Sequence, residues 1–279
     1  RSGTDAGLFN QPGGLALDSA GNLYVADVTN YRIQKFDATG KFLAQAGGRG
    51  AGNGQFEEPW GVAVDGEGNV YVADTFNHRI QKFDANLKFL LAWGKPASSL
   101  DKPEQDAFWG PRDVAVDAAG DVWITDGGTG RVLKYSADGR FIAAFAGPGN
   151  GPGQFAEPTS IEIAANGDIF VADNGNRRVQ RFDADFKFLA EYPVPGWLYV
   201  DSLVKPYIVL LPDGGFVVSD PTQNKLIRFD AQGKPVATLD AKDAPLALPR
   251  GLAFDGKQGL YVAEGQSNQV RRLTLGPAP

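Results

Sequence analysis

The stretch EEPWGVAVDGEGNVYVADTFNHRIQKFD, residues 57–84, recurs in nearly the same form as QPGGLALDSAGNLYVADVTNYRIQKFD at residues 11–37. In both copies, short runs rich in valine, isoleucine and aromatic residues alternate with glycine, asparagine and aspartate. This composition is typical of short antiparallel strands joined by tight turns. A duplicated stretch of this length predicts that the chain is built from a repeated structural unit.

A proline opens each copy, and counting these prolines gives six repeats spaced 43 to 52 residues apart: Pro12, Pro59, Pro111, Pro158, Pro206 and Pro249. Each repeat holds about four strand-like runs, and one meander of that size cannot bury both of its faces alone. Radial stacking into a closed ring buries the faces and protects the strand edges. We therefore expect an all-β, six-bladed β-propeller of four-stranded antiparallel blades, a single domain over residues 1–279, with GVAVD as an innermost strand. Its blades should begin near residues 12, 59, 111, 158, 206 and 249.

The two ends of the chain break the repeat. The opening RSGTDAGLFNQP matches the connection RGAGNGQFEEP of the next repeat and has no outer strand before it, while the closing QVRRLTLGPAP stops at a third strand. We expect a sixth blade that has three strands or is completed by a missing upstream strand. Together with the absence of methionine, this predicts that the domain is excised from a longer protein.

The repeated pattern resembles the NHL repeat, whose name matches Asn77, His78 and the hydrophobic Ile80. The resemblance covers essentially all of the chain and is most specific in the first two copies. It implies a propeller that serves as an interaction domain, often the extracytoplasmic part of a bacterial membrane protein. The expected location is therefore the extracytoplasmic face of a bacterial membrane protein, with a cytoplasmic location left open.

Composition narrows the classes of partner. A net charge of −6 disfavours nucleic acid, which binds basic surfaces. No apolar run approaches the length of a membrane span, so we expect no membrane insertion by this domain, although a parent protein could be anchored. Without cysteine there is neither a disulfide nor a thiolate site.

One periodic feature combines an acid that ends the second strand of a repeat with a base five residues later, as in Asp27 and Arg32 or Asp74 and Arg79. A short hairpin loop would set these side chains opposite each other, and six equivalent copies indicate a structural role. His78, the only histidine, falls in this loop, where we expect a surface role and not a ligand role.

Candidate binding residues are those in which the repeats differ. The residues that follow the prolines should ring one mouth of the channel, and arginines beside aromatic rings there suit an anionic or sugar-like ligand. They are Gly13, Trp60, Arg112, Thr159, Tyr207 and Arg250.

Two acids interrupt the small residues of the inner strands on neighbouring repeats, Asp113 and Glu162. A buried carboxylate needs a partner or a cation. The sequence leaves three interpretations open for this pair: a structural ion pair with an arginine, a ligand site, or a metal site with oxygen ligands.

The long connections at residues 93–110 and 191–207 should bring Trp109, Trp197 and Tyr199 to the same mouth. Exposed aromatics on loops are typical of recognition surfaces. An equal alternative is that they cap the propeller with small cores of their own.

These observations favour a non-catalytic binding module that recognises a glycan, peptide or protein at one mouth of the channel and needs no cofactor. Similar propellers include histidine-dependent lyases, which a single histidine disfavours, and calcium-dependent lactonases. The alternative function is therefore a lactonase-like hydrolase in which Asp113 and Glu162 would help to bind calcium in the channel.

Overall fold

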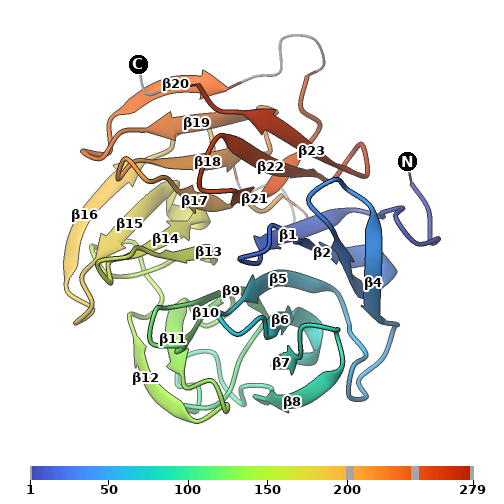
Figure 1. Ribbon diagram of the computed structural model, residues 1–279. Coiled ribbons are helices and arrows are strands. Elements are labelled where there is room, and N and C mark those ends of the chain that lie inside the picture. Colours follow the sequence, from blue (N-terminus) through green and yellow to red (C-terminus); the bar gives the residue numbers. More distant parts are fainter. Residues whose placement is uncertain (1, 199–203, 240–244, 277–279) are drawn as a thin grey trace.

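Six antiparallel sheets surround a common axis in the computed structural model, which describes residues 2–198, 204–239 and 245–276 (Figure 1). Five of the sheets have four strands and the last has three, and within each sheet the strands lie side by side in chain order. The predicted propeller and its three-stranded sixth blade are therefore confirmed.

The strands of the first three blades are β1 (Pro12–Leu17), β2 (Leu23–Asp27), β3 (Arg32–Phe36), β4 (Phe42–Gly47); β5 (Pro59–Val64), β6 (Val70–Asp74), β7 (Arg79–Phe83), β8 (Phe89–Trp93); and β9 (Pro111–Val116), β10 (Val122–Asp126), β11 (Arg131–Tyr135), β12 (Phe141–Phe145). Those of the last three are β13 (Pro158–Ile163), β14 (Ile169–Asp173), β15 (Arg178–Phe182), β16 (Phe188–Pro193); β17 (Ile208–Leu210), β18 (Phe216–Asp220), β19 (Lys225–Phe229), β20 (Pro235–Leu239); and β21 (Pro249–Phe254), β22 (Gly259–Glu264), β23 (Gln269–Thr274).

The inner strands form the wall of the central channel, and β1 packs against both β5 and β21, which closes the ring (Figure 1). Small residues are needed where these strands approach one another. A Cβ atom added at Gly251 would lie 2.1 Å from the backbone oxygen of Gly13 in the next blade. The ring can therefore close at this point because residue 251 is glycine.

Apolar clusters fill the space between successive blades. Tyr71 of blade two and Ile124 of blade three, for example, belong to one buried cluster. Each blade therefore buries its faces against its neighbours, as stacking of incomplete units requires.

The loop between the second and third strands of a blade contains a residue with a positive φ angle, in the left-handed region. Three of these loops contain a 3₁₀ turn, η1 (Val28–Asn30), η2 (Thr75–Asn77) and η3 (Asn174–Asn176). His78 follows η2 with φ of 52°, and the equivalent Tyr31 and Arg177 have φ of 56° and 55°. The position of the only histidine is thus set by loop geometry that every repeat shares.

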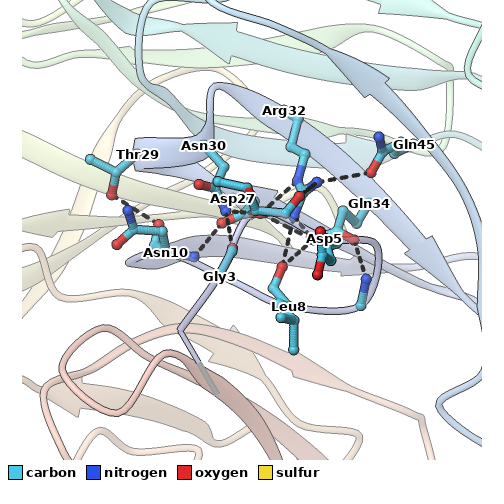
Figure 2. Close-up of polar contacts among 12 residues, drawn as sticks. Gly3, Asp5, Leu8, Asn10, Asp27, Thr29, Asn30, Arg32, Gln34 and Gln45 are labelled. Carbon is cyan, nitrogen blue, oxygen red and sulfur yellow. Dashed lines mark hydrogen bonds and ion pairs between the residues drawn. The ribbon is translucent and has the colours of Figure 1, made fainter.

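In blade one the periodic acid and base form a network that joins the blade to the connection before it (Figure 2). The Arg32 Nε donates to Asp27 Oδ2 over 2.8 Å, and Asp27 has no exposed surface. The same carboxylate accepts from the Asn10 backbone N–H at 2.7 Å, while Arg32 Nη2 donates to the backbone oxygen of Leu8 at 2.8 Å. One ion pair therefore pins the hairpin loop and the segment leading into the inner strand.

The network recurs in blades two and four, where Asp74 pairs with Arg79 at 2.7 Å and Asp173 with Arg178 at 2.9 Å. In blade six the acid is Glu264, and Arg271 Nε takes the role of the base at 2.7 Å. The structural interpretation of the repeated pair is confirmed by these contacts.

In the described part of the chain, no helix is long and apolar enough to cross a membrane.

We predict that Asp27→Ala destabilises the protein by about 3–5 kcal/mol, because Arg32 would stay buried without its counter-charge. Urea unfolding followed by circular dichroism measures this change. Arg49→Ala is the matched control, since it removes an exposed ion pair to Glu57 and should change stability too little to resolve. Equal losses in both variants would contradict the role assigned to the network.

Candidate functional site

Four of the residues that follow the opening prolines meet at one end of the channel. Trp60 comes from blade two, Arg112 from blade three, Tyr207 from blade five and Arg250 from blade six. The guanidinium carbons of Arg250 and Arg112 lie 5.2 and 5.7 Å from the centre of the Trp60 ring. The Tyr207 hydroxyl donates to the backbone oxygen of Trp60 at 3.2 Å. Side chains from opposite sides of the ring therefore fill this end of the channel.

The residues of this cluster, which we call the Trp60 plug, are largely buried. Trp60 is 1% exposed and Arg250 is fully buried, and Arg250 Nη2 donates to Gln11 Oε1 over 2.8 Å. Gly265 leaves the room for this guanidinium, because a Cβ atom there would lie 2.6 Å from its central carbon. The sequence predicted that these residues gather at one end of the channel, and the structure buries Trp60, Tyr207 and Arg250 there and leaves Arg112 partly exposed. Their role in binding a ligand stays a prediction.

Two further candidates are also buried in structural contacts. Thr159 Oγ1 donates to the backbone oxygen of Pro206 at 2.9 Å and links blades four and five. Trp197 is 1% exposed, and its indole N–H donates to the backbone oxygen of Ser219 at 2.8 Å. For Trp197 the capping interpretation describes the structure, because its ring belongs to a core cluster of blades four and five.

Trp109 differs from the other aromatic candidates because it is 43% exposed. Its ring stacks on His78 with centroids 4.8 Å apart, and His78 Nδ1 accepts from the Gly110 backbone N–H at 3.1 Å. Burial lowers the pKa of His78. Tyr199, the third aromatic of the predicted group, lies outside the described residues.

Asp113 is buried and bonded to the backbone of two inner strands. Its Oδ1 accepts from the Val114 N–H at 3.0 Å and its Oδ2 from the Ile161 N–H at 3.1 Å, so the carboxyl joins β9 to β13. Burial raises its pKa to about 7 despite these hydrogen bonds. Asp113 therefore has a structural role at the boundary of blades three and four.

Glu162 lines the channel next to this link and is partly exposed. Burial deep in the propeller, together with the charge of Asp113, raises the pKa of Glu162 to about 8. No hydrogen bond or positive charge from the described residues offsets these two effects. Glu162 is thus the channel acid whose carboxyl has no hydrogen-bond or ion-pair partner among the described residues.

A cavity of about 290 Å³ occupies the channel beyond the Trp60 plug. Its wall is made mainly by the later residues of the six inner strands, and among the described residues that line it the ionisable side chains are Asp113, Glu162 and Tyr207. The six residues that end these strands are all apolar and partly exposed, and form a rim around the cavity: Leu17, Val64, Val116, Ile163, Leu210 and Phe254.

This rim was not predicted from the sequence. The sequence did contain a signal, because each of the six repeats ends its inner strand with an apolar residue. Successive side chains of a strand point to opposite sides, so residues at both ends of an inner strand can face the axis. Only the structure shows which end of the channel is filled and which is hollow.

The channel does not fit a calcium ion. Calcium takes about six to eight oxygen ligands, and this wall offers two carboxyl groups, of which Asp113 already accepts two backbone hydrogen bonds. Within residues 2–198, 204–239 and 245–276, no three histidine, aspartate or glutamate side chains are placed to hold a metal together.

The geometry is that of a six-bladed β-propeller whose central channel is filled by side chains at one end and hollow at the other. The NHL repeat family matches residues 9–36 and 56–83, and the family DUF5128, a 6-bladed beta-propeller, matches residues 115–205. The chain thus contains NHL repeats and folds as a six-bladed β-propeller, as its sequence predicted. No curated protein matches it in sequence.

Solved structures of similar fold include three proteins of different activities. A gluconolactonase from Xanthomonas campestris is 16% identical with a TM-score of 0.68, over 97% of this chain and 88% of that one. Virginiamycin B lyase from Staphylococcus aureus is 15% identical with a TM-score of 0.61, over 96% and 85%. Hydrazine synthase from Kuenenia stuttgartiensis is 16% identical with a TM-score of 0.65, over 96% and 77%. At these identities the similarity establishes the fold alone.

We predict that Trp60→Ala destabilises the protein by about 3–5 kcal/mol, because it empties a buried space and leaves Arg250 without its aromatic partner. Denaturant unfolding measures the loss. Trp109→Ala is the control, because an indole that is nearly half exposed should contribute only about 0.5 kcal/mol. A smaller loss for Trp60 than for Trp109 would contradict the plug.

A second prediction concerns the pH dependence of stability. The pKa of Glu162 is about 8 in the native protein and about 4.3 in an unfolded chain, so between these values the native state holds a proton that the unfolded state releases. This contribution to the free energy of unfolding therefore falls as pH rises from about 4 to 8. Glu162→Gln removes this pH-dependent contribution. The free energy of unfolding of the variant, relative to that of the native protein, should therefore rise between pH 5 and pH 8 by on the order of a few kcal/mol.

Thermal unfolding at pH 5 and pH 8 tests this prediction. The exposed Glu67→Gln should leave the pH trend of the native protein unchanged. A Glu162→Gln variant with the same trend as the native protein would mean that the carboxyl is solvated in the channel.

Proposed function

We propose that this propeller is a non-catalytic binding module whose ligand enters the hollow end of the channel. The observation that carries the proposal is the cavity of about 290 Å³, which is rimmed by six apolar side chains and holds one carboxyl, that of Glu162, without a bonding partner among the described residues. Ligand sites of proteins are commonly apolar hollows with a few convergent polar groups.

The chemistry of the wall favours an apolar segment of a peptide or protein that carries a cationic group. Apolar atoms would replace water along the rim, and an ammonium group would face Glu162 and favour its ionised form. A glycan fits less well, because Trp60, Tyr207 and Arg250, which would bind it, are buried in the Trp60 plug. The size of the cavity admits one side chain or a short chain terminus.

The calcium-dependent lactonase remains the weaker proposal, since two carboxyl groups in an apolar wall supply too few oxygen ligands. The extracytoplasmic location and the absence of nucleic-acid partners, both inferred from sequence, stay predictions.

Calorimetric titration with hexylamine and hexanol tests the proposed ligand class. Both probes should bind the apolar channel, and hexylamine should bind more tightly as pH rises from about 6 to 8, because Glu162 ionises over this range while the amine stays charged. Glu162→Gln should weaken hexylamine binding by about tenfold and leave hexanol binding unchanged.

Glu67→Gln is the matched control and should leave the affinity for both probes as it is in the native protein. Equal affinities of the native protein and Glu162→Gln for hexylamine would refute the cationic part of the proposal. The channel would be refuted as the site if the native protein bound neither hexylamine nor hexanol but bound glycans on an array, and if Trp60→Ala abolished that glycan binding.

A further inference from the structure

Each residue of the apolar rim is followed by the turn that leads to the second strand of its blade, and in four blades this turn begins with an aspartate. The carboxylate accepts the backbone N–H groups two and four residues later, as Asp65 Oδ1 does from Glu67 at 3.0 Å and from Asn69 at 2.8 Å. Such a bond from a side chain to its own turn fixes the turn. The four acids are Asp18, Asp65, Asp117 and Asp255.

The neighbouring blades four and five depart from this pattern. Ala164 and Leu211 stand where the other four blades have the acid. At these two turns the hollow end of the channel is therefore bordered by apolar side chains in place of carboxylates.

The loss of the acid also leaves backbone donors available in both turns. Asn166 Oδ1 accepts from the Asp168 N–H at 3.1 Å, and Asp213 Oδ1 accepts from the Gly215 N–H at 2.9 Å, so one of the two turn bonds is replaced in each blade. The other donors, the N–H groups of Asn166 and Asp213, have no acceptor among the described residues. Both residues are exposed, so a ligand can accept these two hydrogen bonds.

The base of the third strand adds to the opening between blades four and five. In blade two, Lys82 Nζ reaches across to the next blade and donates to the backbone oxygen of Ala137 at 3.1 Å. The equivalent Arg181 of blade four donates from Nε to Asp168 of its own blade at 2.8 Å. Ala231 of blade five, which corresponds to Ala137, therefore lines an open hollow.

This hollow, which we call the blade-five notch, has a volume of about 570 Å³ and is continuous with the channel. The rim residues Ile163, Leu210 and Phe254 line both spaces. Glu162 directly precedes Ile163 in β13, so the channel acid lies beside the entrance to the notch. The rest of the notch is lined by small or apolar residues of the turns, among them Ala164, Ala165, Leu211, Pro212, Gly214 and Gly256.

The chemistry of the notch favours a peptide backbone with apolar side chains. Its charged residues are already paired, since Arg181 binds Asp168 and Arg228 Nη2 donates to Asp213 at 2.6 Å. Apolar side chains would cover the floor and release water. The two open N–H groups suit carbonyl oxygens, which a peptide supplies at every residue and an alkyl chain lacks.

The position of Glu162 favours the amino terminus of such a peptide. The Trp60 plug fills the far end of the channel, so a chain that enters from the hollow end cannot pass through. A terminal ammonium group is attached directly to the backbone, so the residues after it can continue from Glu162 into the notch. A lysine side chain would instead separate the charge from the backbone by four methylene groups.

We propose that the ligand of the channel is the free amino-terminal segment of a partner protein, an inference that rests on the function proposed above. The terminal ammonium group faces Glu162, and the apolar residues that follow it lie extended in the blade-five notch. Their backbone carbonyls accept hydrogen bonds from the N–H groups of Asn166 and Asp213.

Anisotropy titration with three peptide amides tests the proposal on the whole chain. The first is AVLAGSK with a free amino terminus and fluorescein on its lysine side chain, the second is the same peptide acetylated at the amino terminus, and the third is ADSAGSK. We expect saturable binding of the first at pH 7, and binding at least about tenfold weaker for the other two, which lack the ammonium group or the apolar side chains. The first peptide should also slow hydrogen exchange of the Asn166 and Asp213 amides.

Variants of the protein locate the segment. Ala165→Lys fills the notch, and Ala118→Lys adds the same charge at the equivalent exposed position of blade three, outside the notch. Ala164→Asp restores the acid that four other blades carry, so its turn should fold normally and engage the Asn166 N–H. Ala165→Lys and Ala164→Asp should weaken binding of the first peptide by about tenfold, and Ala118→Lys should leave it unchanged. All three variants should bind hexanol in the channel as the native protein does.

The outcomes separate this inference from the function on which it rests. If the native protein binds hexylamine and hexanol but binds the free and acetylated peptides equally, the amino-terminal segment is refuted and the channel stands as the site. The same conclusion follows if Ala165→Lys binds the first peptide as tightly as the native protein does. If the native protein binds neither hexylamine nor hexanol, the proposed function fails and this inference fails with it.

Discussion

The buried pair of an aspartate and an arginine between the second and third strands is the interaction on which the rest of the structure depends. Asp27 ties the hairpin loop to the connection before its own blade, and Arg32 extends the tie to Leu8. A buried pair is stabilising only when further hydrogen bonds satisfy its remaining atoms, and this network supplies them. The same pair in blades two and four fixes the entry of their inner strands into the ring in the same way.

Because the inner strands enter at equivalent positions, their first residues all converge at one end of the channel and their last residues at the other. At the first end the repeats differ, and side chains of different size and charge fill the axis as the Trp60 plug. At the second end they are uniformly apolar and of moderate size, so they surround a cavity without closing it. The one channel acid without a bonding partner among the described residues, Glu162, lies in that hollow part.

Blade six departs from the pattern that the other blades share. Blade six keeps the acid of the network as Glu264 but uses Arg271 as its base, and its described part has no fourth strand. The neighbouring core is correspondingly less well covered, since Phe9, Leu23 and Phe36 retain exposed surface that their counterparts in blade two lack.

The sequence by itself determined the number of blades, the order of strands, the irregular last blade and the structural role of the acid and base pairs. These follow from local patterns, turn residues and alternating apolar side chains, which recur in every copy. It also identified Trp60, Arg112, Tyr207 and Arg250 as a group. Only the tertiary structure decided that Trp60, Tyr207 and Arg250 of this group are buried, that Asp113 bonds to the backbone of β13, and that the opposite end is hollow. The physical reason is that contacts across the axis join side chains from different blades, and their sizes and directions become comparable only when the ring is closed.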